Sequence, residues 1–206
     1  YLHPNVFTPD ESVLDILGMK KREKYAIVRF VAWQASHDIG HKGISYENKI
    51  KLVNTLSKHL RVFISSETEL PDELKKYKIN IPPEQMHNAL AFAHLFIGES
   101  GTMASESAVL GTPNILINSR APSIGIHKEL SQRFKLQYIF STISEAWDLI
   151  DYFACSSEPK EEMRHKVDIL YKNKIDVTAF LVWFIDNYPN SIKEAKNLDF
   201  IYSSFH

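Results

Sequence analysis

Residues 98–106 combine small residues, hydroxyl groups and a carboxylate at a spacing that suits a phosphorylated ligand. The segment is Gly-Glu-Ser-Gly-Thr-Met-Ala-Ser-Glu and follows the apolar run 95–97. Ser100 and Thr102 can cap a helix that follows and donate hydrogen bonds to phosphate oxygens, and Gly101 lets the backbone approach a ligand closely. A helix that begins here would offer free N–H groups and a positive dipole end to an anion.

Glu106 extends this pattern by one helical turn. It lies four residues after Thr102, so both residues share a helix face, and helical side chains lean toward the N-terminus. A phosphate at the turn and a carboxylate one turn away suit a nucleoside diphosphate, with Glu106 accepting hydrogen bonds from two ribose hydroxyls. The alternative is an ordinary strand-to-helix connection with a solvated Glu106, and the spacing alone does not separate the two.

The rest of the chain alternates strand and helix patterns. Apolar runs with strand character lie at 24–33, 61–65, 77–80, 95–97, 114–118 and 136–140. Helical patterns lie at 46–59, 70–76, 82–93, 144–153, 159–172 and 176–188. Such alternation predicts an α/β fold, a doubly wound parallel sheet of about six strands with C-terminal helices. The turn at 98–102 then lies at the carboxyl edge of the sheet, where open α/β sheets bind ligands.

The turn and the helix after it resemble the signature of the non-hydrolysing UDP-N-acetylglucosamine 2-epimerases. In these enzymes a Ser-Gly-Gly turn is followed by a glutamate and then by Gly-x-Pro. The intervals from Ser100 to Glu106 and to Pro113 match without gaps, and Thr102 stands where the epimerases have glycine. GT-B glycosyltransferases share a looser version of the pattern. The resemblance implies that Ser100, Gly101 and Thr102 hold a diphosphate and that Glu106 binds the ribose.

The chain is also similar to the C-terminal part of an uncharacterised prokaryotic family related to these epimerases. The segment 29–45 carries Arg-Phe-x-Ala, His-Asp and Gly-Ile-Ser, and 81–87 carries Ile-Pro-Pro-Glu-x-Met-His. The resemblance covers about residues 1–120 and implies a Rossmann-like fold of the GT-B C-terminal type. It also places a uracil base near Ile81. His87, on the next helix, is either a binding residue or a buried packing residue.

The first residues suggest how the chain is divided. Prolines at positions 4 and 9 disfavour a helix, and a similar extended stretch enters the C-terminal domain of GT-B proteins. We expect 1–23 to be an entry segment from an N-terminal domain that is missing here. Residues 24–155 would form the nucleotide-sugar-binding domain, and 156–206 would form helices that pack on it or on the missing domain.

Two further groups of residues fit this division. Residues 121–125 follow a predicted strand and form either a sugar-side loop or a plain connection. An aromatic group at helical spacing is expected to be core or a patch for the missing domain: Phe180, Trp183, Phe184 and Tyr188. Acid and base groups from the missing domain would be absent, so this chain alone is expected to be inactive.

The loop after the first predicted strand holds the densest group of reactive side chains: Trp33, Gln34, Ser36, His37, Asp38, His41 and Lys42. It follows the carboxyl end of a strand, so it could face the same cleft as the turn at 98–102. His37, His41 or Lys42 could neutralise phosphate charge or position a substrate hydroxyl. Of these, His37 is the one candidate catalytic side chain. The alternative is that this loop is a mobile polar loop, which Gly40 and Gly43 favour.

Other interpretations of these motifs lack essential parts. The His37-Asp38 pair resembles the core of metal-dependent HD phosphohydrolases, but it does not lie in a helical pattern. His37 and His41 have zinc-ligand spacing only on a helix, and no third ligand is evident, so we expect no metal. Thr102 stands where a nucleophile elbow has its second glycine, so we do not expect a serine hydrolase. The lack of a Gly-x-Gly-x-x-Gly motif argues against a nicotinamide, and no cofactor is expected.

Composition bounds the remaining possibilities. The 206 residues are 44% hydrophobic and 24% charged, which is typical of a globular domain. A net charge of −1 without a basic stripe disfavours nucleic acid. Cys155 is the only cysteine, which favours a reducing, cytoplasmic setting, and the longest apolar cluster, at 177–183, is too short to span a bilayer.

The sequence therefore predicts a domain that binds a nucleotide sugar, with UDP as the expected nucleotide. It would belong to an epimerase-like or glycosyltransferase-like enzyme and would hold the diphosphate and the ribose. The alternative is a non-catalytic nucleotide-sugar sensor or an interaction domain that keeps the fold without turnover. Turnover by the full-length protein would separate the two, and the oligomeric state stays open.

Overall fold

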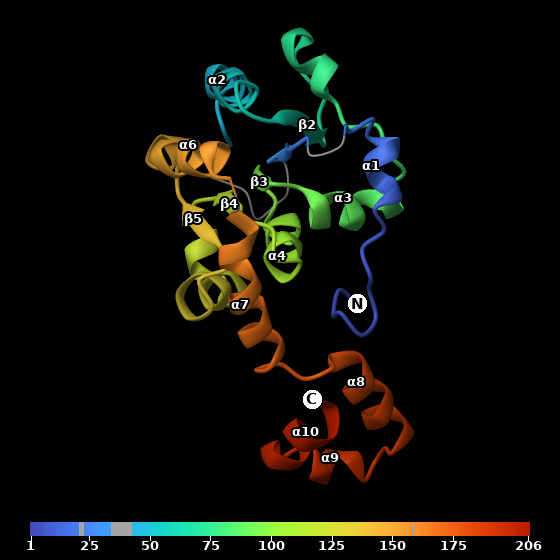
Figure 1. Cartoon of the computed structure of the whole chain (residues 1–206). Coiled ribbons are helices and arrows are strands. Elements are labelled where there is room, and N and C mark those ends of the chain that lie inside the picture. The colour runs from blue at the N-terminus through green and yellow to red at the C-terminus, as the bar shows by residue number, and fades with distance from the viewer. Residues whose placement is uncertain (21–22, 34–42, 158) are drawn as a thin grey trace.

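The core of the protein is a parallel β-sheet (Figure 1). The structure is a computed structural model, and it describes residues 1–20, 23–33, 43–157 and 159–206. The sheet has five strands in the order β2-β1-β3-β4-β5. Their bounds are β1 (Tyr25–Phe30), β2 (Arg61–Ser66), β3 (Leu95–Gly98), β4 (Asn114–Ile117) and β5 (Tyr138–Phe140). All four neighbouring pairs are parallel, so the predicted α/β class and doubly wound sheet are confirmed.

Helices cover both faces of this sheet. The α-helices are α1 (Ser12–Ile16), α2 (Tyr46–Leu56), α3 (Met86–Phe92), α4 (Gly101–Val109), α5 (Gly125–Lys128), α6 (Trp147–Cys155), α7 (Pro159–Tyr171), α8 (Val177–Asp186), α9 (Ser191–Glu194) and α10 (Leu198–Phe205). Short 3-10 or π turns are η2 (Asp72–Tyr77), η3 (Pro83–Gln85), η4 (Ala121–Ser123), η5 (Glu129–Arg133) and η6 (Ile143–Glu145). Helices α2 and α6 pack on one face, and α1, α3 and α4 pack on the other.

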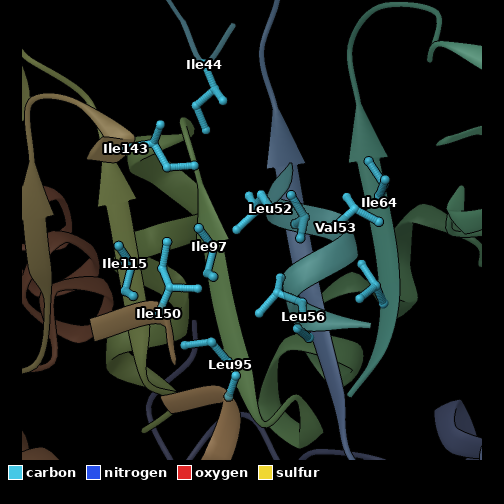
Figure 2. Packing of buried hydrophobic residues seen from close by; sticks show 14 of the residues in the cluster. Ile44, Leu52, Val53, Leu56, Ile64, Leu95, Ile97, Ile115, Ile143 and Ile150 are labelled. Carbon is cyan, nitrogen blue, oxygen red and sulfur yellow. The ribbon is translucent and has the colours of Figure 1, made fainter. Parts of the chain in front are cut away.

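Buried side chains of the strands alternate between the two faces because successive strand residues point to opposite sides. Val28 of β1 belongs to the cluster under α2 and α6, and its neighbour Ile27 belongs to the opposite cluster. Figure 2 shows the first cluster, in which Leu52 and Leu56 of α2 and Ile150 of α6 lie over the strands. Burying one such side chain stabilises the fold by about 1.5–3 kcal/mol, so both faces support the sheet.

The prediction of a strand at 77–80 is wrong, which accounts for five strands where about six were expected. Among the described residues, this segment forms only an isolated parallel bridge from Lys78 to Ile64. The turn η2 ends at Tyr77, and Pro82 begins the chain's approach to η3. Few residues are left to pair, and proline has no N–H to continue a ladder.

The C-terminal helices fall into two groups. Helix α7 packs against the end of α4 and against η5, with Met163 and Leu170 buried in a third cluster. Helices α8, α9 and α10 lie beyond it at the end of the molecule (Figure 1). Their interior is aromatic, and the ring contacts join Phe180, Trp183, Phe184, Phe200 and Phe205. Tyr188 of the predicted aromatic group is exposed instead.

Lys160 links α7 to the end of α3, because its ammonium group donates a hydrogen bond to the carbonyl oxygen of Ala91. Burial lowers the pKa of Lys160 from 10.5 to about 8. Between these two values the unfolded chain binds more protons than the folded chain, so stability falls as the pH drops from 10.5 to 8.

We expect Lys160→Met to remove this pH dependence. We compare the free energy of unfolding of the native chain with that of the variant at each pH. The difference, native minus variant, should rise by about 2–3 kcal/mol between about pH 8 and 10.5. Urea titrations at several pH values measure the difference, with Lys193→Met, which removes an exposed lysine of α9, as the control. A Lys160→Met chain with the native pH dependence would contradict this assignment.

Candidate functional site

The site lies where the strand order changes direction. In the order β2-β1-β3-β4-β5 the chain moves from β1 to one side and, after β2, returns to the other side. The connections after β1 and β3 therefore leave toward opposite faces and open a crevice at the carboxyl ends of these two strands. Ser100 and the N-terminus of α4 lie there, directly after β3.

Ser100 is the N-cap of α4, as predicted. Its backbone is extended, and its Oγ accepts a hydrogen bond from the N–H of Met103 at 3.4 Å. The N–H groups of Gly101 and Thr102 come next, and helix geometry gives them no acceptor within the helix. Thr102 is exposed. The first turn of α4 can therefore offer two amides, a hydroxyl group and the positive end of the helix dipole to an anion.

Glu106 lies one turn further along α4 and contacts two groups that are distant in the sequence. Its Oε1 accepts a hydrogen bond from the Tyr1 hydroxyl at 2.7 Å and lies 3.2 Å from Nε2 of His87. The hydrogen bond to Glu106 raises the pKa of Tyr1. The rings of Tyr1 and Phe7 also contact the His87 ring, so the first residues lie beside this part of α3 and α4 (Figure 1).

The other predicted binding residues are placed differently. Ile81 follows the bridge at Lys78 and packs its side chain against the core cluster under α1, α3 and α4. That side chain is partly buried, and a contact between Ile81 and a base stays a proposal. His37 lies outside the described residues. The structure thus brings Ser100, Gly101, Thr102, Glu106 and His87 together on α4 and the neighbouring α3.

Glu99 is a residue of the site to which sequence reasoning assigned no role. It is buried, and its Oε2 accepts a hydrogen bond from the N–H of Val31 at 3.0 Å. Its Oε1 accepts from Nε1 of Trp33 at 2.9 Å and from the N–H of Ile44 at 2.6 Å. One carboxylate therefore fixes the segment after β1 and the approach to α2 against the end of β3. The sequence signal that could have identified Glu99 is a charged residue within a turn of apolar and small residues.

His127 is a second residue that sequence reasoning missed. It belongs to α5, and its Nδ1 lies 2.9 Å from Oε1 of Gln137 and 3.4 Å from Oγ of Ser105. Its Nε2 lies against Gly101, because a Cβ added there would be 2.5 Å from this nitrogen. Gly101 therefore makes room for an imidazole ring as well as for the turn. Burial lowers the pKa of His127.

A cavity of about 690 Å³ lies beside Glu106. Its walls come from the first residues, α4, α5, η5, α7 and the start of α8, and they include Leu2, Val6, Val109, Ile126, Leu130, Leu170 and Val177. These seven side chains are apolar, and Glu129, Lys174 and Asp176 add charged groups to the lining. The cavity can take an apolar group that is connected to a ligand at Glu106.

The described part of the chain lacks the features of two other kinds of site. Across residues 1–20, 23–33, 43–157 and 159–206, no three His, Cys, Asp or Glu side chains are grouped as metal ligands would be. The same ranges contain no helix with the length and apolar character needed to cross a membrane.

Solved structures share this fold, whereas no protein-family model matches the chain and no curated protein sequence is similar to it. The wall teichoic acid polymerase TagF matches with a TM-score of 0.52 and 8% identity, over 78% of this chain and 41% of its own. The calicheamicin glycosyltransferase CalG4 matches with a TM-score of 0.45 and 13% identity, over 72% of this chain and 38% of its own. A putative UDP-N-acetylglucosamine 2-epimerase from Listeria monocytogenes matches with a TM-score of 0.42 and 16% identity, over 84% of this chain and 47% of its own.

The match to TagF bears on the fold. The chain spans about two fifths of the TagF chain. At such low identity the likeness to TagF shows the fold alone, and it confirms the expected Rossmann-like domain of the GT-B type.

Proposed function

We propose that this chain is a nucleotide-sugar-binding domain of a glycosyltransferase-like or epimerase-like enzyme. The first turn of α4 would hold the diphosphate, and Glu106 would accept hydrogen bonds from the ribose of a UDP-sugar. The observation that carries the proposal is the position of Ser100 and Glu106 on one helix that begins at the β1–β3 crevice. The resemblance of the same residues to the epimerase signature supports it.

The contact between Tyr1 and Glu106 supports the ribose assignment. A hydroxyl group donates to the Glu106 carboxylate at 2.7 Å, which is the contact that a ribose hydroxyl would make. Glu106 is therefore accessible to a hydroxyl donor from outside α4, and its side chain is only 15% exposed. A hydrogen bond in such a partly desolvated place contributes more than one in open water. The nucleotide would displace Tyr1 from this position.

The proposed chemistry follows from charge. When a bond to a nucleotide sugar breaks at the anomeric carbon, negative charge develops on the diphosphate. Amides and a helix dipole that already point at this group stabilise the charge without reorganising. The part of the enzyme that supplies acid and base groups is proposed to be an N-terminal domain, in line with the two fifths of TagF that this chain spans. A non-catalytic sensor would bind the same ligand without turnover by the full-length protein.

Calorimetric titration of this chain with UDP tests the proposal. Glu106→Gln keeps the size of the side chain but exchanges a charged acceptor for a neutral amide, so we expect UDP affinity to fall about 10- to 100-fold, or about 1.5–3 kcal/mol. Tyr1→Phe removes the competing hydroxyl and should raise UDP affinity a few-fold. Glu194→Gln changes an exposed glutamate of α9 and is the matched control.

The outcomes separate clearly. Weaker binding by Glu106→Gln together with stronger binding by Tyr1→Phe would support a ribose contact at Glu106. Equal affinities for all three variants would place UDP elsewhere and contradict the assignment. If the folded native chain binds no UDP at millimolar concentration, the proposal fails for this domain.

A further inference from the structure

We propose that His127 is an additional phosphate-binding residue, which donates a hydrogen bond from Nε2 to the diphosphate at the N-terminus of α4. This inference rests on the proposed function, because the diphosphate is the ligand that His127 would contact. It adds a side chain from α5, outside the turn at Ser100–Thr102, and it gives binding a pH dependence that the turn alone would lack.

The position of the ring carries the inference. His127 is only 5% exposed, and its Nε2 lies 2.5 Å from the point where a Cβ of Gly101 would be. Helical Cα–Cβ bonds tilt toward the N-terminus, so this point is beside the end of α4 where the free N–H groups emerge. Within the described ranges, the hydrogen bonds of the His127 ring involve only Nδ1, and Nε2 has no partner. An unpartnered nitrogen of a buried side chain is thus aimed at the place proposed for the anion.

The partner of Nδ1 determines what Nε2 can do. With Oε1 of Gln137 facing it, Nδ1 carries the hydrogen, and Nε2 of the neutral ring is a bare acceptor. The amide nitrogen of Gln137 is buried and has no partner in the described part of the chain. Protonation of the ring keeps the bond from Nδ1 to Gln137 and turns Nε2 into a donor. The doubly protonated ring therefore fits Gln137 on one side and a phosphate oxygen on the other.

The surroundings of the His127 ring favour its protonation when an anion binds. The groups that contact the ring from other elements are neutral, the hydroxyl of Ser105 on α4 and the amide of Gln137 before β5. Lys128 and Glu129 follow it in the chain, and Glu129 is paired with Lys174 and Arg133. Burial lowers the pKa of His127, so the free protein holds the ring neutral at pH 7. A diphosphate at hydrogen-bond distance would raise this pKa, and binding would take up a proton.

The test measures the pH dependence of ligand affinity. UDP-N-acetylglucosamine is the probe, because its diphosphate has no terminal phosphate that would titrate near neutral pH. For the native chain we expect affinity to fall as the pH rises from about 6 to 8, by up to about tenfold per pH unit, with uptake of up to one proton per ligand. Titrations in two buffers with different ionisation enthalpies give the proton uptake directly.

Two variants separate a phosphate contact from a structural role. His127→Gln keeps an amide donor near the position of Nε2 but cannot titrate, so its affinity should be nearly constant with pH. His127→Ala should lose about tenfold or more in affinity at pH 6. Both variants are compared in a His87→Gln background, because His87 beside Glu106 is the other histidine described in the site.

Each result has one meaning. A native profile that is flat with pH, or that His127→Gln leaves unchanged, would overturn the role of His127 while the UDP site stands. No binding by the folded native chain at any pH would overturn the proposed function, and this inference with it.

Discussion

Glu99→Ala should lower the free energy of unfolding by about 3–5 kcal/mol, the largest effect that we expect from a side chain of the site. The carboxylate accepts hydrogen bonds from the backbone N–H groups of Val31 and Ile44 and from the indole of Trp33. Removing it leaves three donors without an acceptor, and each buried orphan donor costs about 1–3 kcal/mol.

Urea unfolding of the variants measures this loss. Glu67→Ala is the matched control, because Glu67 also accepts from the backbone beside β1, at Ala32, and from Arg29, but its side chain is 43% exposed. We expect the control to cost no more than about 1 kcal/mol, since water can replace the lost acceptor. Glu99→Gln should recover part of the loss, because one of its two acceptors remains. Equal losses for the Glu99 and Glu67 variants would contradict a structural role for the buried carboxylate.

The predictions that the structure confirms depend on local sequence pattern. Residues 95–97 are apolar and are followed at once by a small-residue turn, so the end of β3 and the cap at Ser100 follow from the sequence. The interval from Thr102 to Glu106 places both on one face of any helix, whatever surrounds it. The alternation of strands and helices was sufficient for the parallel sheet. The chemistry that was assigned to these residues stays a proposal.

The contacts that could not be foreseen join residues far apart in the chain. Tyr1 meets Glu106 across 105 positions, and Glu99 meets Val31 across 68. No spacing rule connects such pairs, because they depend on how α3, α4 and the first residues pack. The wrong strand at 77–80 has the same origin, since strand propensity does not say whether a neighbour is available for pairing.

Gly98→Ala should destabilise the chain by about 2–3 kcal/mol, the second large effect. A Cβ at this position would lie 2.8 Å from the backbone oxygen and 2.8 Å from the Cβ of Arg29. Neither atom can move away easily, because β1 and β3 are paired here and the N–H of Glu99 donates to that same oxygen at 3.0 Å. Crowding a well-packed place costs about 1–3 kcal/mol, and backbone atoms yield less than flexible side chains.

Gly125→Ala is the control, because a Cβ at Gly125 would meet no atom within 4 Å. Its stability should stay within about 0.5 kcal/mol of the native chain, since it is an uncrowded surface substitution. A shift between β1 and β3 would also move Glu99 and Ser100, so Gly98→Ala should weaken UDP binding more than its loss of stability alone would predict. Urea unfolding and calorimetry on the same samples measure both effects. If Gly98→Ala were as stable as Gly125→Ala, β1 and β3 would have to separate at low cost, and the crevice would be too loosely held to present the α4 N-terminus to a diphosphate.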